Sequence, residues 1–257
     1  MESLATQTWQ LNDGTAFLDV GKLSGTVRAA HPAHGLSAIQ WNSLPVGGQI
    51  LGVTAGAASM SAGPILLGQL SEKGCRAETF VRGDDFVANF AQRDRLPFSC
   101  QIYWRAVSQA NHVVVLDTII SVQTELLESF PQIAVETRLA SEEVWFVDGG
   151  ADSAHPIKDH AAVQFTDQKT CCLVLRALTA NWSYAEMSHP ADRGTWKIEQ
   201  SASGERLVQR QFDGAFLEKG VIRRLRVRGA FLPRDNDMQL AAECYASLAA
   251  EAPPLTA

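Results

Sequence analysis

The densest group of side chains capable of chemistry lies between residues 181 and 196, in the segment NWSYAEMSHPADRGTW. It follows the β-like run CCLVLRAL, and we interpret it as a loop at the end of a strand. β-Proteins commonly place binding sites on such loops. Aromatic rings suit the apolar faces of sugar rings, while carboxylates and imidazole suit sugar hydroxyls. The segment therefore predicts a site that handles carbohydrate.

Acid–base chemistry on a sugar is one interpretation of this segment. Ring opening at an anomeric carbon needs one group to remove the hydroxyl proton and another to protonate the ring oxygen. The ordinary pKa values of Glu and His are about 4.3 and 6.5, so modest shifts place both near neutrality. Candidate catalytic residues are His189 and Glu186, and candidate substrate-binding residues are Trp182, Tyr184 and Asp192. The alternative is a surface loop with a structural aromatic residue and a histidine bonded to backbone.

Three further residues are candidates for substrate binding. Arg82, in RGDDF, can grip a carboxylate or phosphate through two hydrogen bonds, as a sugar acid or sugar phosphate requires. Tyr103 and Arg105 share one face of the strand-like QIYWR, and Trp104 takes the other face. The alternative for Arg82 is a solvated turn with local ion pairs.

A one-sided row of arginines occurs in VIRRLRVRG, formed by Arg224, Arg226 and Arg228. Such a row can bind an anionic polymer, or it can pair with acidic side chains on the next strand. Arg223 falls on the apolar side of the same strand, where a charge needs a partner.

Composition is typical of a globular protein, with 257 residues, 46% hydrophobic and 19% charged. The net charge of −6 argues against a nucleic-acid partner, because phosphate binding needs a positive field. No basic stretch leads into an apolar core at the start, and the apolar runs fall short of a membrane span. We therefore expect a cytoplasmic protein with no membrane partner. The sequence leaves its oligomeric state open.

The five cysteines form neither a disulfide framework nor a zinc site, since their number is odd, two are adjacent and no CxxC occurs. Buried reduced thiols are expected instead. HPAH and HPIKDH contain ligand types without a recognised metal spacing. Dinucleotide, P-loop and serine-hydrolase motifs are absent from the sequence, so neither a cofactor nor a metal is expected.

Period-two patterns dominate the chain and predict an all-β fold. In PQIAVETRLA, Ile133, Val135, Thr137 and Leu139 point one way, and Gln132, Glu136 and Arg138 the other. HVVVLDTIISVQT is apolar on both faces, as expected for a central strand covered on both sides. One helix is predicted over about 236–251, with Asn236 as its cap and Gln239 in capping-box position. We predict one domain, 1–257, built as a large antiparallel two-sheet sandwich with this C-terminal helix.

The closing pattern DGAFLEKGVIRRLRVRGAFL resembles the late strands of the galactose mutarotase-like supersandwich fold. VRGDDFVANF, QIYWR, SVQTELLES and SYAEMSHPAD also look like segments of uncharacterised bacterial proteins with this fold. The resemblance covers roughly residues 15–233. Members of the superfamily bind carbohydrate, and they include aldose 1-epimerases, hexose-phosphate epimerases and accessory domains of glycosidases and polysaccharide lyases.

The resemblance implies a carbohydrate ligand held on a concave sheet face. In the epimerases a glutamate acts as base and a histidine as acid, which points to Glu218 in FLEKG and His189 in SHP. The match departs from the family pattern, because LEKGV lacks the proline often found after the glutamate. Three functions stay open: a sugar-binding or sugar-processing protein, an epimerase or lyase using His189 with Glu186 or Glu218, and a non-enzymatic structural or assembly protein.

Overall fold

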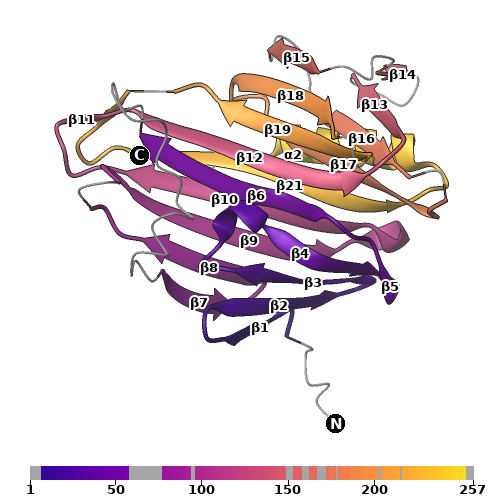
Figure 1. Cartoon of the computed structure of the whole chain (residues 1–257), viewed down its shortest axis with the longest axis horizontal. Coiled ribbons are helices and arrows are strands. Elements are labelled where there is room, and N and C mark those ends of the chain that lie inside the picture. Colours follow the sequence, from indigo (N-terminus) through magenta and orange to yellow (C-terminus); the bar gives the residue numbers. More distant parts are fainter. Residues whose placement is uncertain are drawn as a thin grey trace.

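The computed structural model describes residues 7–57, 77–93, 96–148, 153–157, 162–166, 172–177, 179–201, 204–214 and 216–252. Within these ranges the chain forms two large antiparallel sheets with a helix behind one of them (Figure 1). The prediction of an all-β, two-sheet sandwich with one C-terminal helix is confirmed. No helix in the described ranges is long and apolar enough to cross a membrane.

The first sheet, sheet A, contains most of the early strands together with four later ones. In spatial order its strands are β1 (Trp9–Asn12), β2 (Thr15–Val20), β3 (Leu23–Arg28), β4 (Leu36–Trp41), β6 (Gln49–Ala57), β12 (Pro131–Ala140), β19 (Glu205–Phe212), β18 (Gly194–Gln200) and β15 (Val163–Thr166). The short β5 (Leu44–Pro45) pairs with β4, and the 3-10 helix η1 (Pro32–His34) precedes β4.

The second sheet, sheet B, contains the long central strands. In spatial order they are β14 (Ala154–Pro156), β13 (Glu143–Val147), β16 (Cys172–Arg176), β17 (Trp182–Ser188), β21 (Ile222–Pro233), β10 (Val114–Gln123), β9 (Ser99–Ser108), β8 (Asp85–Phe90) and β7 (Glu78–Arg82). A separate pair joins β11 (Glu128–Ser129) to β20 (Leu217–Glu218), and the 3-10 helix η2 (Ala110–His112) precedes β10.

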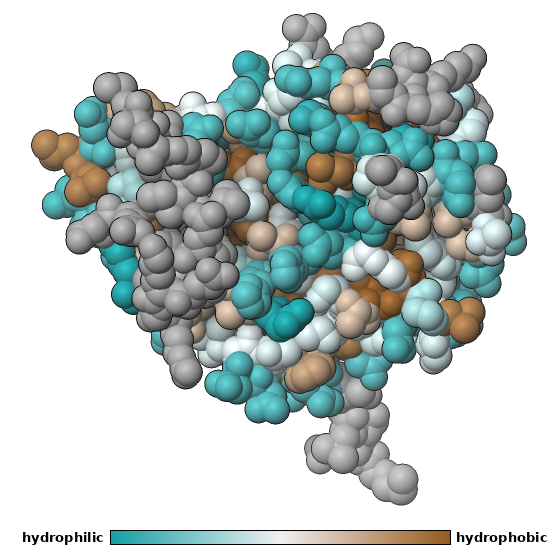
Figure 2. Space-filling view, in the orientation of Figure 1, coloured by the Kyte–Doolittle hydropathy of each residue, from teal (hydrophilic) through white to brown (hydrophobic). Residues whose placement is uncertain are grey.

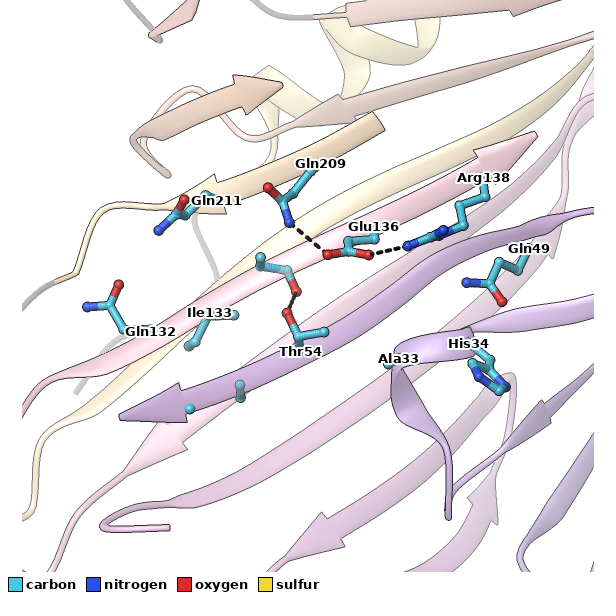
Figure 3. Close-up of a pocket in the computed structure, with 13 residues that line it drawn as sticks. Ala33, His34, Gln49, Thr54, Gln132, Ile133, Glu136, Arg138, Gln209 and Gln211 are labelled. Carbon is cyan, nitrogen blue, oxygen red and sulfur yellow. Dashed lines mark hydrogen bonds and ion pairs between the residues drawn. The ribbon is translucent and has the colours of Figure 1, made fainter. Parts of the chain in front are cut away.

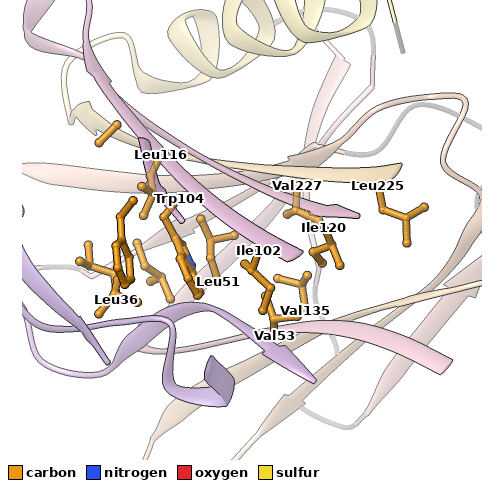
Figure 4. Packing of buried hydrophobic residues seen from close by; sticks show 14 of the residues in the cluster. Leu36, Leu51, Val53, Ile102, Trp104, Leu116, Ile120, Val135, Leu225 and Val227 are labelled. Atoms are coloured by element: carbon orange, nitrogen blue, oxygen red, sulfur yellow. The ribbon is translucent and has the colours of Figure 1, made fainter. Parts of the chain in front are cut away.

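The main core lies between the two sheets, and apolar side chains from both point into it (Figure 4). The predicted alternation in β12 is confirmed, because Ile133, Val135, Thr137 and Leu139 are buried against sheet B while its polar residues face outward. Each large apolar side chain buried in this way stabilises the fold by about 1.5–3 kcal/mol. The polar side of β12 is therefore left free to form a surface.

A second, smaller core lies on the outer face of sheet B, under helix α2 (Asp237–Ala250). The helix packs on β13, β16, β17 and β21. Val113 and Val115 belong to this second core, whereas Val114 and Leu116 belong to the first. The strand β10 is thus covered on both faces over its first half, which explains the apolar character that the sequence shows there.

The helix begins as predicted, but the expected capping box does not form. Asn236 adopts a left-handed conformation and makes no side-chain cap hydrogen bond. Asp237 fastens this end instead, accepting hydrogen bonds from Arg176 at 2.8 and 2.5 Å and from the Ser183 hydroxyl at 2.5 Å. A carboxylate in the first turn also suits the positive end of the helix dipole.

The cysteines in the described ranges are reduced and buried, as predicted. They are Cys100, Cys172 and Cys244. Burial raises the pKa of the Cys100 thiol to about 12, so it stays protonated at neutral pH. Cys75 and Cys171 lie outside the described residues.

Candidate functional site

A hollow of about 720 Å³ lies on the outer face of sheet A, over β6, β12 and β19 and beside η1 (Figure 3). Hydrophilic side chains gather over the middle of this face (Figure 2). Its polar lining consists of His34, Gln49, Thr54, Gln132, Glu136, Arg138, Gln209 and Gln211. The rest of the lining is Ile133 and four small residues, which leave the hollow open; these are Ala33, Ala55, Gly56 and Ala134.

Strand alternation and register bring these polar groups together. On β19, Val208 and Phe212 are buried while Gln209 and Gln211 face outward. Gln209 pairs with Glu136 across β12 and β19, and Arg138 pairs with Gln49 across β12 and β6. Amide, carboxylate and guanidinium groups from three strands therefore share one surface.

Two glycines allow η1 to pack beside the hollow. A Cβ at Gly52 would lie 2.0 Å from the backbone oxygen of Ala33, and a Cβ at Gly35 would lie 2.0 Å from that of Ile50. Gly35 also has a φ of 53°, which glycine adopts without steric cost. These close contacts hold η1, and with it His34, at the edge of the hollow.

The carboxylate of Glu136 is the electrostatic centre of the hollow. One of its oxygens accepts a hydrogen bond from the Gln209 amide at 2.7 Å, and the other lies 3.6 Å from the Arg138 guanidinium. The Glu136 side chain is only 18% exposed, so its position is well defined, whereas that of Arg138 is half exposed. The two charges cancel and leave a polar surface with no strong net charge.

His34 contributes a neutral imidazole to the same surface. Partial burial, together with the positive charges of His31 and Arg28, lowers the pKa of His34 below its usual value. The ring stacks on that of His31 with a centroid distance of 5.4 Å. At neutral pH this side chain therefore provides one hydrogen-bond donor and one acceptor.

The predicted site residues lie elsewhere, and the segment interpreted as a loop begins as a strand. Residues Trp182–Ser188 form β17, in the middle of sheet B. Trp182 and Tyr184 pack on Phe231 with ring centroids 5.5 and 5.4 Å apart. The aromatic residues that suggested sugar stacking thus contribute to the core, because their alternation matches a strand.

Glu186 is completely buried between the sheets and makes a small polar network there. One carboxylate oxygen accepts hydrogen bonds from the Thr137 hydroxyl at 2.5 Å and the Tyr184 hydroxyl at 2.9 Å. The other oxygen is buried without a partner in the described structure. Burial raises the pKa of Glu186 to about 7, against a partial lowering by these two hydroxyls.

His189 anchors the end of helix α2, and Asp192 bonds to strand β21. The His189 Nε2 lies 3.0 Å from the backbone oxygen of Glu251, and Nδ1 accepts a hydrogen bond from the Ala191 amide at 3.1 Å. Nε2 therefore carries the proton. Asp192 accepts a hydrogen bond from the Arg226 amide at 3.0 Å. Both ring nitrogens of His189 are occupied by backbone groups.

We expect His189→Ala to lower the free energy of unfolding by about 1–3 kcal/mol, because it removes two hydrogen bonds to backbone groups, each worth about 0.5–1.5 kcal/mol. Urea denaturation measures this change. The matched control is His155→Ala, since His155 is exposed on the edge strand β14 and its loss should cost less than about 0.5 kcal/mol. Equal stability of the two variants would contradict the anchoring role.

Arg82, Tyr103 and Arg105 lie on sheet B, away from the hollow. Arg105 bonds Asp85 through two hydrogen bonds, at 2.7 and 3.0 Å, and Arg82 lies 3.8 Å from the same carboxylate. Across the next strands Asp117 pairs with Arg228. A cross-strand row of alternating charges results, formed by Asp85, Arg105, Asp117 and Arg228. The local ion pairs considered as the alternative for Arg82 are present.

Glu218 is exposed on the short strand β20, opposite Glu128 of β11. His189 lies at the end of β17 against the helix terminus, so the two residues paired by resemblance stand on different elements. The catalytic roles of His189, Glu218 and Glu186 stay predictions. None of the nine predicted site residues lines the hollow on sheet A.

The sequence did contain a signal for this hollow. The alternation in PQIAVETRLA places Gln132, Glu136 and Arg138 on the outward face of one strand. Such a pattern also fits any solvated sheet edge. Only the sheet order shows that β12 is an inner strand, flanked on either side by β6 and β19.

No protein-family model matches the sequence, and no curated protein matches it. Solved structures do match. A putative aldose 1-epimerase from Klebsiella pneumoniae superposes with a TM-score of 0.57 at 8% identity, over 91% of this chain and 83% of that one. A GalM/aldose epimerase homologue from C. elegans superposes with a TM-score of 0.56 at 8% identity, over 85% of this chain and 99% of that one.

An α-galactosidase, AgaB from Geobacillus stearothermophilus, matches with a TM-score of 0.52 at 8% identity, over 88% of this chain. The match covers 41% of AgaB, so the chain spans about two fifths of that enzyme's length. Identities this low carry the fold alone. The two antiparallel sheets and these superpositions show that the chain has the galactose mutarotase-like supersandwich fold.

Proposed function

We propose that this protein binds a carbohydrate, and specifically a neutral sugar, in the hollow on the outer face of sheet A. The observation that carries the proposal is a group of amide side chains around the mostly buried carboxylate of Glu136, in a hollow of about 720 Å³. Ligand sites in proteins commonly have volumes of about 300–1,000 Å³. The sugar-related names of the structural neighbours support the same class of ligand.

The chemistry of the lining suits hydroxyl groups. A sugar hydroxyl both donates and accepts, and a glutamine amide offers a donor and an acceptor from one side chain. Glu136 accepts and Arg138 donates, so adjacent hydroxyls can be bound in a fixed order. Because these two charges cancel, a neutral sugar fits this surface better than a sugar acid does.

Acid–base chemistry at the anomeric centre is a second candidate, favoured by a carboxylate and an imidazole that line the same hollow. A general acid must hold a dissociable proton at the working pH. The lowered pKa of His34 leaves its imidazole mostly neutral, which weakens it as an acid. A mostly neutral His34 therefore favours binding over epimerisation. The rate at which the α and β anomers of glucose or of galactose interconvert, followed through their anomeric proton signals by NMR, measures the reaction directly.

We expect Glu136→Gln to raise the dissociation constant for a neutral sugar about tenfold or more, because charge-assisted hydrogen bonds are about twice as strong as neutral ones. Isothermal titration calorimetry with galactose, glucose and short neutral oligosaccharides provides the measurement. Glucuronate serves as the charged comparison ligand.

The matched control is Glu218→Gln, which makes the same replacement at the exposed glutamate singled out by resemblance. The proposal expects this variant to bind as the unaltered protein does. Loss of binding in Glu218→Gln but not in Glu136→Gln would move the site away from sheet A. Absence of binding across the neutral sugars would overturn the proposal and favour a structural role.

A further inference from the structure

A second polar hollow, of about 350 Å³, lies on the outer face of sheet B. It lies over β8, β9, β10 and β21, at their ends distant from helix α2. Four residues form one continuous row across these strands, and the register pairs each with the next: Asn89, Gln101, Ser121 and Arg224. The row faces the opposite side of the sandwich from the hollow on sheet A.

Arg224 differs from the two arginines that follow it on the same face of β21. Arg228 forms two hydrogen bonds with Asp117, at 2.7 and 2.8 Å, and Arg226 bonds Glu251 at 2.6 Å. In the described part of the chain Arg224 has neither a hydrogen bond nor an ion pair, although it is half-buried. Acidic partners therefore neutralise two of the three arginines in the row, and the charge of Arg224 remains at the hollow.

A chain of hydrogen bonds orients the neighbouring amides as donors. The Tyr103 hydroxyl donates to Oε1 of Gln101, and Nε2 of Gln101 donates to Oδ1 of Asn89 at 2.5 Å. Because both amide oxygens are occupied in this way, the Asn89 amide nitrogen is left to donate. With the Ser121 hydroxyl and the Arg224 guanidinium, the hollow offers mainly donors.

We infer that this second hollow binds an oxyanion, either the carboxylate or the phosphate group of a small ligand. A cation surrounded by neutral donors matches the several acceptor oxygens of such a group. Glu78 on the edge strand β7 lines the rim and can accept hydrogen bonds from hydroxyls on the remainder of the ligand. This inference is independent of the proposed sugar site, which lies on the other sheet and whose arginine, Arg138, is paired with Glu136.

Titration calorimetry with sodium phosphate and with sodium glucuronate, at constant ionic strength in sodium chloride, tests the inference. Arg224→Gln is expected to weaken the binding of whichever probe binds, phosphate or glucuronate, about tenfold or more. Which of the two probes binds identifies the group as phosphate or carboxylate. Asn89→Leu removes a neutral donor and is expected to weaken the same probe several-fold, so it decides the question if Arg224→Gln does not fold.

Two control variants separate this site from general charge effects. Arg28→Gln removes an exposed charge from sheet A and should leave binding unchanged. Arg138→Gln removes the arginine of the sheet A hollow and reports any binding of the probe there. Binding lost in Arg138→Gln but kept in Arg224→Gln would place the anion in the sheet A hollow and overturn the inference. Binding of neither probe, or equal loss in all arginine variants, would also overturn it.

Discussion

Asp117→Ala is expected to lower the free energy of unfolding by about 3 kcal/mol, because it leaves the buried guanidinium of Arg228 without its main partner. Asp117 and Arg228 are each only 5% exposed, and two hydrogen bonds join them. Burial alone would lower the pKa of Arg228, but the hydrogen bonds and charges of Asp117 and Glu251 together outweigh that effect and raise it. Glu251, 3.0 Å from Arg228, retains part of the charge pairing. The loss should therefore fall at the lower end of the range for broken buried pairs.

Urea denaturation of Asp117→Ala, Arg228→Met and the double variant gives the coupling energy of the pair. The double variant should recover much of the lost stability, because no unpaired charge remains buried. Arg82→Ala is the comparison, since Arg82 is 69% exposed and its 3.8 Å pair with Asp85 should contribute less than about 1 kcal/mol. A loss in Asp117→Ala as small as that in Arg82→Ala would contradict the assigned role.

The same ion pair shows what the sequence predicts and what it leaves open. The spacing of Arg224, Arg226 and Arg228 predicts that they share one strand face, and β21 confirms it. One of the two interpretations of that spacing is pairing with acidic residues on the next strand. The register between β21 and β10 places Asp117 opposite Arg228, so this pairing forms at Arg228. The register and the position of Glu251 at the helix end decide which arginine has no acidic partner. Strand periodicity alone predicts neither of these.

The candidate site was harder to predict for a related reason. Its polar groups come from β6, β12 and β19, which become neighbours only through long-range pairing. Each strand taken alone shows ordinary outward polarity. By contrast, residues 181–196 concentrate chemistry within one short segment, but in the fold Tyr184 and Glu186 face the core while His189 reaches the helix end. Closeness in sequence therefore does not bring these side chains to one surface, because the strand buries Tyr184 and Glu186 while His189 lies beyond the end of the strand.

The buried Glu186 is expected to make the stability of this protein depend on pH. Its pKa is raised to about 7 in the folded state, against 4.5 as the ordinary value, because burial penalises the charged form and its described hydrogen-bond partners are both neutral hydroxyls. The folded state therefore binds more protons than the unfolded state between these two pH values. Stability should be greatest below about pH 4.5 for this group, and fall as pH rises to about 7.

The size of the effect follows from the shift. A difference of about two and a half pKa units corresponds to about 3 kcal/mol of unfolding free energy, lost between pH 4.5 and pH 7. Glu186→Gln keeps the shape of the side chain and cannot ionise. Relative to the unaltered protein, this variant should thus gain about 3 kcal/mol as the pH is raised from 4.5 to 8.

Urea denaturation of both proteins at pH 5, 6, 7 and 8 measures the difference between their unfolding free energies. The difference is compared because other groups titrate in both proteins and change each curve alike. Glu218→Gln is the matched control, since Glu218 is exposed and its variant should follow the unaltered protein at every pH. The amide nitrogen that Glu186→Gln introduces takes a buried position that lacks a partner in the described structure, which costs the variant about 1–3 kcal/mol at every pH. That constant cost lowers the whole curve without changing its slope. Parallel curves for Glu186→Gln and the unaltered protein would mean that Glu186 is ionised in the folded state, and that the two hydroxyls of Thr137 and Tyr184 suffice to hold a buried charge.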